Sequence, residues 1–180
     1  MVLGPDRFTE HAQEVINSAQ QILMRYRHNQ LDSEHILLAL IEQEKGVPAE
    51  IFKELGVNLD VLHANLHKFL ESSPKVGGQR NQIYQTPTVG LLFQLADSES
   101  KRFNDEFIAT EHILIALADK SMPSTSSILS EFAVTSEEIY KALKKIRGAH
   151  RVTDQKSESR YRSLEKYAID LTSLASDGKL

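Results

Sequence analysis

Two glutamate–histidine pairs, Glu34-His35 and Glu111-His112, carry the most chemistry in this chain, and each stands at the start of an apolar segment. A carboxylate one residue after a helix cap gains about 0.3 to 1 kcal/mol from the helix dipole, so a local structural role is one interpretation of both acids. The histidines point about 100° away from the acids around a helix, which is poor geometry for a shared metal ion. The chain also has no cysteine. We interpret both histidines as structural and expect no metal site.

Two threonines obey the same spacing as the acids. The shift of 77 residues between the two glutamates also takes Thr9 to Thr86, and both threonines are expected at the starts of other helices. A helix dipole acting on each acid alone does not explain this pairing. The matched positions differ in charge, because the same shift takes His28 to Asp105.

A third candidate site is apolar. Leu91 and Leu95 form an i, i+4 pair off the core-facing side of their helix, where the first copy has Glu14 and Ser18. If exposed, the pair offers a groove for extended, unfolded segments, and its removal from water contributes about 1.5 to 3 kcal/mol per leucine. Such binding is weak and reversible. The alternative is that the helix is rotated and buries both leucines.

These candidates depend on a duplicated helical unit. The segment 33–40 returns as 110–117, and without a gap the same shift aligns residues along both copies, which a duplication explains. Apolar residues at helical spacing predict four helices in each copy, with repeat one at 8–70 and repeat two at 85–147. We therefore predict an all-α fold of two pseudo-twofold-related four-helix repeats, eight helices in all, plus a C-terminal linker helix. No strand is expected.

Caps and breakers set the expected helix boundaries. In both copies the second helix, from Ser33 and from Thr110, is apolar on every side and must be central. Repeat one is expected to have its other helices at 9–26, 48–55 and from Asn58 onward, and repeat two at 87–103, 124–132 and 135–147. The Ser-, Pro- and Gly-containing stretch 72–82 indicates a surface linker between the copies.

The composition changes after Gly148. Residues 151–159 are polar, and an apolar stripe at helical spacing follows from Tyr161 to Leu174. We expect one domain at 1–148 and a linker at 149–180 that leads towards an absent module.

The overall charge limits the possible partners. The chain has 180 residues, a net charge of −4 and no apolar segment near the length of a membrane span. We expect a cytoplasmic protein with no nucleic-acid and no membrane partner.

Together, the start Arg7-Phe8-Thr9-Glu10, the twin Glu-His-Ile-Leu helices and the ungapped spacing resemble the double Clp repeat, the N-terminal domain of AAA+ unfoldases and disaggregases. The tail 161–172, followed by Gly178-Lys179-Leu180, is similar to the connector of ClpB-type disaggregases, and the repeats look equally like those of ClpC. The chain has no Gly-x-x-x-x-Gly-Lys-Ser/Thr loop. We therefore expect no ATPase or other enzymatic activity in this chain.

The resemblance implies a chaperone of the heat-shock stress response. The domain would recruit unfolded or aggregated polypeptide and pass it to an ATPase ring; the alternative is a docking domain for adaptors or phosphoarginine tags, as in ClpC. In ClpB-type domains the positions Thr9, Asp105 and Glu111 are linked with engaging substrate. In ClpC-type domains the symmetric threonine and glutamate positions form two pockets for phosphorylated arginine. The candidate binding residues are accordingly Thr9, Glu34, Thr86, Leu91, Leu95, Asp105 and Glu111.

The same resemblance sets expectations for cofactors and assembly. No cofactor is expected in this chain, whereas the parent protein would bind ATP and Mg²⁺. The fragment is expected to be monomeric and the parent to be a homohexamer.

Overall fold

Two helices, α2 (Ser33–Glu42) and α6 (Thr110–Leu117), form the centre of the computed structural model, which describes residues 3–77 and 82–157. Every residue of α6, and every residue of α2 up to Ile41, is buried. The two helices contact each other across the molecule. The prediction that these all-apolar helices are central is confirmed.

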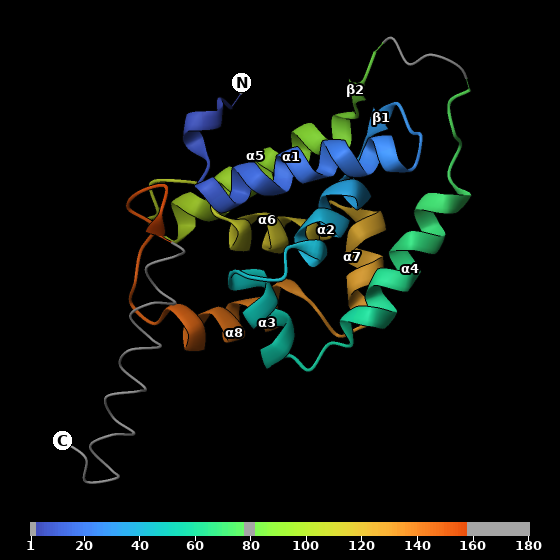
Figure 1. Ribbon diagram of the computed structural model, residues 1–180. Coiled ribbons are helices and arrows are strands. Elements are labelled where there is room, and N and C mark those ends of the chain that lie inside the picture. Colours follow the sequence, from blue (N-terminus) through green and yellow to red (C-terminus); the bar gives the residue numbers. More distant parts are fainter. Residues whose placement is uncertain (1–2, 78–81, 158–180) are drawn as a thin grey trace, which may run out of the picture.

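Six further α-helices surround this pair (Figure 1). Repeat one contributes α1 (Glu10–Arg25), α3 (Val47–Glu54) and α4 (Leu59–Ser72). Repeat two contributes α5 (Pro87–Arg102), α7 (Pro123–Ser130) and α8 (Ser136–Arg147). A short 3₁₀ helix, Pro5–Arg7, precedes α1. In Figure 1, α1 and α5 lie along one side of the central pair, and α3 and α8 lie on the opposite side. The eight predicted α-helices are confirmed, and no described helix is both long and apolar enough to cross a membrane.

The caps of α2 and α6 lie one residue earlier than expected. Asp32 and Ala109 are the N-cap residues, so Ser33 and Thr110 are the first helical residues rather than the caps. The ring Nδ1 of the third helical residue, His35 or His112, accepts the N-cap backbone N–H at 3.0 or 2.8 Å. The sequence interpretation of both histidines as structural fits this geometry, which resembles a capping box with histidine in place of glutamate.

A short strand of one repeat pairs in parallel with a short strand of the other, which the sequence did not predict. β1 (Gln30–Leu31), just before α2, pairs with β2 (Tyr84–Gln85), just before α5. An isolated parallel bridge between Phe8 and Ile108 joins the segments before α1 and α6 in the same way. These pairings satisfy backbone groups at helix starts from distant parts of the chain, so no local sequence pattern reports them.

Residues 150–157, which we call the exit segment, run back from α8 to the start of α1. Val152 is fully buried, and the Glu10 N–H donates to the Gln155 carbonyl oxygen at 3.0 Å. Part of the expected linker therefore packs on the repeats. The predicted linker helix from residue 161 lies outside the described residues.

The end of the third helix differs between the two repeats. Gly56 follows α3 with φ of 67°, and the equivalent residue after α7 is Ala133, with φ of 59°. The left-handed region costs a residue with a Cβ roughly 1 kcal/mol or more, and glycine avoids this cost. Repeat two therefore carries a backbone strain that repeat one avoids.

We expect Ala133→Gly to raise the free energy of unfolding by roughly 0.5 to 1 kcal/mol, because it relieves this strain. The matched variant Gly56→Ala should lower the free energy of unfolding by a similar amount. An added Cβ at Gly56 meets no atom within 4 Å, so the cost of the left-handed backbone conformation is the only one added. Urea unfolding followed by circular dichroism measures both. Two variants that shift stability in the same direction would contradict the assignment.

Candidate functional site

A fully buried charge cluster lies in repeat two between α6, α8 and the loop after α5. We call Asp105, Glu111, His112 and Arg147 the repeat-two cluster. The Asp105 carboxylate accepts a bidentate pair from the Arg147 guanidinium, with Nη1 2.9 Å from Oδ2 and Nη2 2.7 Å from Oδ1. His112 Nε2 lies 2.7 Å from Oδ2, and the Val152 N–H donates to Oδ1 at 2.8 Å. Each carboxylate oxygen of Asp105 therefore accepts two hydrogen bonds.

The cluster keeps Asp105 ionised. Burial alone would raise the pKa of Asp105, but the hydrogen bonds from His112, Arg147 and the Val152 N–H hold that pKa below its ordinary value. His112 Nδ1 already accepts a backbone N–H, so the neutral ring carries its proton on Nε2 and donates it to Asp105. The Asp105 charge is thus matched by the Arg147 guanidinium inside the protein.

Glu111 completes the cluster. Its carboxylate oxygen Oε2 lies 3.6 Å from Arg147 Nη1, and its side chain has 0% exposure. The Phe103 ring lies under the guanidinium, with its centroid 5.2 Å from the Arg147 Cζ. Asp105 and Glu111 have no exposed side-chain surface in this arrangement.

Repeat one has different residues at the same positions. His28 stands in place of Asp105, and Leu70 stands in place of Arg147. His28 Nδ1 lies 2.8 Å from His35 Nε2, and their rings meet edge to face. Repeat one therefore has a histidine and an apolar leucine in place of Asp105 and Arg147, whereas Glu111 and His112 keep their counterparts in Glu34 and His35.

An open cavity of about 460 Å³ accompanies this replacement. Its walls include Asp32, Glu34 and both histidines of the pair, together with Phe69 and Leu70 from α4. Burial is the main cause that raises the pKa of Glu34, and the nearby Asp32 charge raises it further, against hydrogen bonds that lower it. In repeat two the counterpart of Glu34, Glu111, lies 3.6 Å from the Arg147 guanidinium, and Arg147 lines a cavity of about 310 Å³ that does not include Glu111.

The two threonines lie at helix starts of opposite repeats. The Thr9 N–H donates to the Ile108 carbonyl oxygen at 3.0 Å, just before α6, and the Thr86 N–H donates to the Leu31 carbonyl oxygen at 3.0 Å, just before α2. Both threonines are N-cap residues, as expected, Thr9 of α1 and Thr86 of α5. The Thr9 hydroxyl accepts the Ala12 N–H, whereas the Thr86 hydroxyl makes no such cap bond and donates to Asp32 at 3.1 Å. The structure thus brings Thr9 beside the helix that carries Glu111, and Thr86 beside the helix that carries Glu34.

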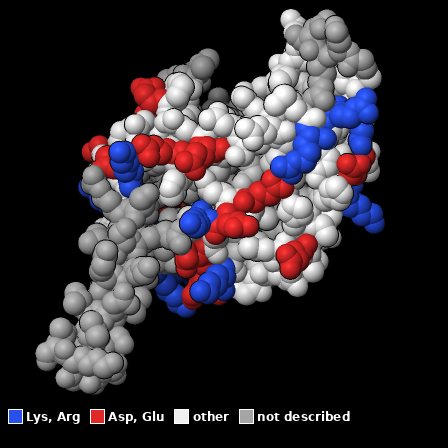
Figure 2. All heavy atoms as spheres, viewed as in Figure 1, with Lys and Arg blue, Asp and Glu red and all other residues white. Residues whose placement is uncertain are grey.

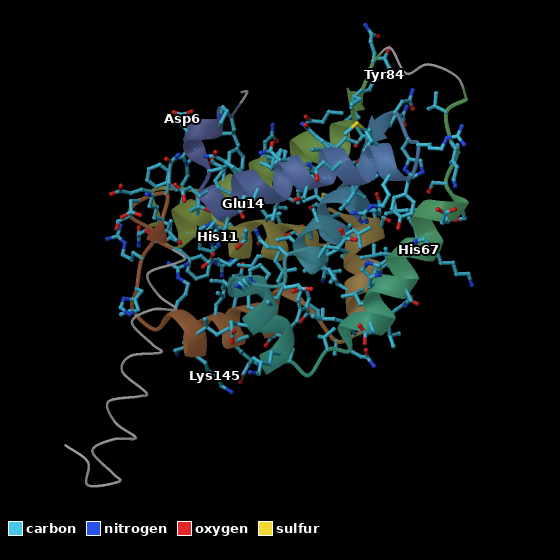
Figure 3. The ribbon with its side chains drawn as sticks, in the orientation of Figure 1. Asp6, His11, Glu14, His67, Tyr84 and Lys145 are labelled. Atoms are coloured by element: carbon cyan, nitrogen blue, oxygen red, sulfur yellow. The ribbon has the colours of Figure 1, made fainter. Side chains whose placement is uncertain are left out.

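The two leucines of α5 have different surroundings. Leu91 is 37% exposed, whereas Leu95 is half-buried and packs against the core. The chain just before α5 exposes Ile83 and Tyr84 by about half, and Tyr84 stands at the end of the molecule away from α3 and α8 (Figure 3). Leu91 is therefore the exposed member of the predicted pair, and Ile83 and Tyr84 add exposed apolar side chains just before α5.

Sequence reasoning missed Arg147. The available signal was a break in the repeat, because a charged residue in α8 stands where α4 has a core leucine, Leu70. A charged side chain at a core-facing position indicates a buried partner of opposite charge.

One face of the molecule carries charges of both signs. On the face in Figure 2, acidic side chains gather over the amino-terminal half of α1, and basic ones lie both towards the edge near α4 and over α8, so this face carries no uniform basic field. Within residues 3–77 and 82–157 no group of three or more His, Cys, Asp or Glu side chains could hold a metal ion.

The sequence of this chain matches a known protein family and known chaperones. The family model described as the Clp repeat (R) N-terminal domain matches residues 7–132. The chain is 36% identical over 177 residues to the chaperone protein ClpB of Gloeobacter violaceus and 37% identical over 178 residues to ClpB 1 of Synechococcus elongatus. Each match covers 98% of this chain and 20% of the relative, so the chain spans about one-fifth of the length of these relatives.

A solved structure shares the fold. The Hsp104 N-terminal domain from Candida albicans superposes with a TM-score of 0.74 at 21% identity, covering 84% of this chain and 98% of that domain. This likeness supports the all-α fold.

The histidine pair of repeat one makes stability depend on pH. Burial, followed by the neighbouring His28, lowers the pKa of His35 from 6.5 to about 4. Between these values the unfolded chain binds a proton at His35 and the folded chain does not, so stability falls as the pH falls. We expect the free energy of unfolding to decrease by roughly 2 to 3 kcal/mol between pH 7 and pH 4.5, measured by urea unfolding at each pH.

The control is His35→Gln, which retains an acceptor for the Asp32 N–H but cannot titrate. We expect this variant to lose most of the pH dependence in that window. An unchanged slope in His35→Gln would show that other groups cause it.

Proposed function

Because the chain belongs to the Clp repeat N-terminal domain family, we propose that it recruits unfolded or aggregated polypeptide for a protein-disaggregating chaperone of the AAA+ class. The relatives are several times longer than this chain, and ATP, Mg²⁺ and the assembly of a hexamer would belong to the rest of such a protein. This domain would supply binding rather than catalysis.

The apolar surface around Leu91 is the observation that carries this proposal. Leu91 is 37% exposed on α5, the half-buried Leu95 lies one turn away, and exposed Ile83 and Tyr84 precede the helix. Exposed apolar side chains can bind many different unfolded segments, because these segments share exposed apolar side chains and no common shape.

The size of this surface supports weak binding. Full burial of a leucine contributes about 1.5 to 3 kcal/mol, and Leu91 has only part of its surface left to bury. A contribution of roughly 1 kcal/mol from each of Leu91, Ile83 and Tyr84 gives about 3 kcal/mol, which corresponds to millimolar affinity and suits a domain that must release its substrate.

Three other predicted residues are buried, and in this proposal they stabilise the fold instead of contacting substrate. The side chains of Asp105 and Glu111 have 0% exposure, and Thr9 is fully buried at the cap of α1. In this arrangement the three residues hold helix starts in place, and contact with substrate falls to the apolar surface.

We expect Leu91→Ser to raise the dissociation constant for an unfolded protein about threefold to sixfold, because it removes the exposed part of the apolar surface. Leu91→Ser with Leu95→Ser should weaken binding further. Fluorescence anisotropy with labelled, reduced and carboxymethylated lactalbumin measures the affinity. Because Leu95 packs on the core, thermal unfolding of the double variant must be measured in parallel.

The matched control is Val61→Ser, an exposed apolar residue on α4. It should leave the affinity unchanged. Equal affinities of Leu91→Ser and the unaltered protein would sink the proposal that this surface recruits substrate.

The open cavity favours a second candidate function, the docking of arginine-containing tags or adaptors at repeat one. Glu34 lines this space, and its counterpart Glu111 lies beside the Arg147 guanidinium, so a partner's arginine side chain suits it. A phosphorylated arginine suits it less well, because the Asp32 carboxylate already accepts the Ser33 N–H at the start of α2. An added phosphate would meet a negative charge there.

We expect millimolar binding of free arginine that Glu34→Gln abolishes and Glu111→Gln leaves unchanged, with no gain for phosphoarginine because Asp32 repels its phosphate. Isothermal titration calorimetry with both ligands measures this. Phosphoarginine that binds at least tenfold tighter than arginine would contradict the expected repulsion by Asp32 and would favour phosphoarginine tags as the ligand of this cavity. Absence of saturable binding of either ligand would reject this second candidate.

A further inference from the structure

The exit segment is held by the charge cluster of repeat two. The Val152 N–H donates to Asp105 Oδ1 at 2.8 Å, and the Glu106 N–H donates to the Val152 carbonyl oxygen at 2.8 Å. The Val152 side chain is fully buried. The segment therefore uses both backbone groups of Val152 and its side chain to attach to the loop that carries Asp105.

Arg147 holds the exit segment from the other side. Its Nη2 atom, which donates to Asp105, also donates to the His150 carbonyl oxygen at 2.9 Å. The Arg151 guanidinium donates to the Asn104 carbonyl oxygen. The same ion pair that satisfies the buried Asp105 charge thus fixes the first residues of the exit segment.

The far end of the exit segment covers the start of α1. The Glu10 N–H, one of the N–H groups that a helix start leaves without an intrahelical acceptor, donates to the Gln155 carbonyl oxygen at 3.0 Å. The Gln155 side chain donates to the Phe8 carbonyl oxygen at 3.2 Å. Three stretches of chain distant in sequence, 5–10, 104–109 and 150–157, therefore meet at one place.

Repeat one lacks this arrangement. His28 takes the place of Asp105 and directs its Nδ1 to His35, and Leu70 offers no cation to a following carbonyl group. The chain after α4 makes a backbone bond instead, from the Val76 N–H to the Arg27 carbonyl oxygen at 2.8 Å. The side-chain anchor is thus particular to the repeat from which the chain leaves.

We propose that Asp105 is a positioning residue that latches the exit segment across the start of α1 and thereby sets the direction in which the chain leaves repeat two. Loss of the latch releases residues 150–157 and uncovers the Glu10 N–H and the loop at Glu106. Only the purpose of the latch rests on the proposed function: in a recruiting domain, the latch would set how the domain is held relative to the chain that follows it.

Hydrogen exchange of single amides, measured by NMR, tests the latch. In Asp105→Asn we expect the amides of Val152, Glu106 and Glu10 to exchange at least tenfold faster, because all three donate within the latched arrangement. Amides inside α6, such as that of Leu117, should change less than threefold. Unchanged exchange at the three amides, or an equal acceleration in α6, would overturn the proposal.

Two further variants keep the test decisive. Val152→Ser removes the buried apolar side chain of the exit segment and leaves the side chains of the charge cluster unchanged. It should accelerate exchange at the same three amides, and it serves as the test if Asp105→Asn does not fold. Asp97→Asn alters the other buried aspartate of repeat two, which pairs with Arg7 and Lys101, and should leave the Val152 amide protected. Acceleration at Val152 in Asp97→Asn would show that any buried charge loss has this effect.

Binding measurements separate the latch from the proposed function. Asp105→Asn should accelerate exchange in the exit segment while the isolated chain retains its affinity for carboxymethylated lactalbumin within twofold. Leu91→Ser should do the reverse. A latch without polypeptide binding would refute only the proposed function, and binding without a latch would refute only this inference.

Discussion

Two helices that are apolar on every side must be enclosed completely, and this constraint determines the rest of the structure. Neither repeat encloses its own central helix. The helix α2 contacts α5 and α7 of the other repeat, and α6 contacts α1 and α3. Each repeat therefore completes the core of its partner, as expected for a unit that cannot bury its apolar face alone. Either half alone would expose part of the apolar surface of its central helix.

The shared core leaves the helix starts as the places where the repeats differ. At the start of α6 a buried aspartate, a histidine and an arginine balance their charges internally, and at the start of α2 two histidines and a leucine leave an open cavity. Both helix starts provide an acceptor for the N-cap backbone N–H, because the third helical residue is a histidine whose Nδ1 accepts it in each repeat. The core conserves its shape in both repeats while the chemistry beside it diverges.

This divergence separates two tasks. Leu91 on α5 is exposed, whereas Asp105 and Arg147 are buried and bond to each other and to the exit segment. A buried ion pair contributes little net stability compared with apolar packing, but removal of one partner is costly. Such a pair is therefore well suited to hold a segment in one defined position.

Local patterns in the sequence determined the eight helices, their central pair and several boundaries. The side chains of Thr9 and Asn58 cap helices, and Gly56 adopts a positive φ after α3, because these roles depend only on residues a few positions away. The repeat also determined that His28 and Asp105 occupy matched positions, although not what each of them contacts.

Only the tertiary structure decided which helix starts meet, that Arg147 pairs with Asp105, and that Leu91 is exposed while Leu95 is half-buried. Each of these depends on residues that lie tens of positions apart and are brought together by the enclosure of α2 and α6. Helical periodicity reports which side of a helix is apolar, but the neighbours that cover that side are set by packing across the whole chain. The sequence therefore determined the elements and their core faces, and the packing of the two repeats decided the site.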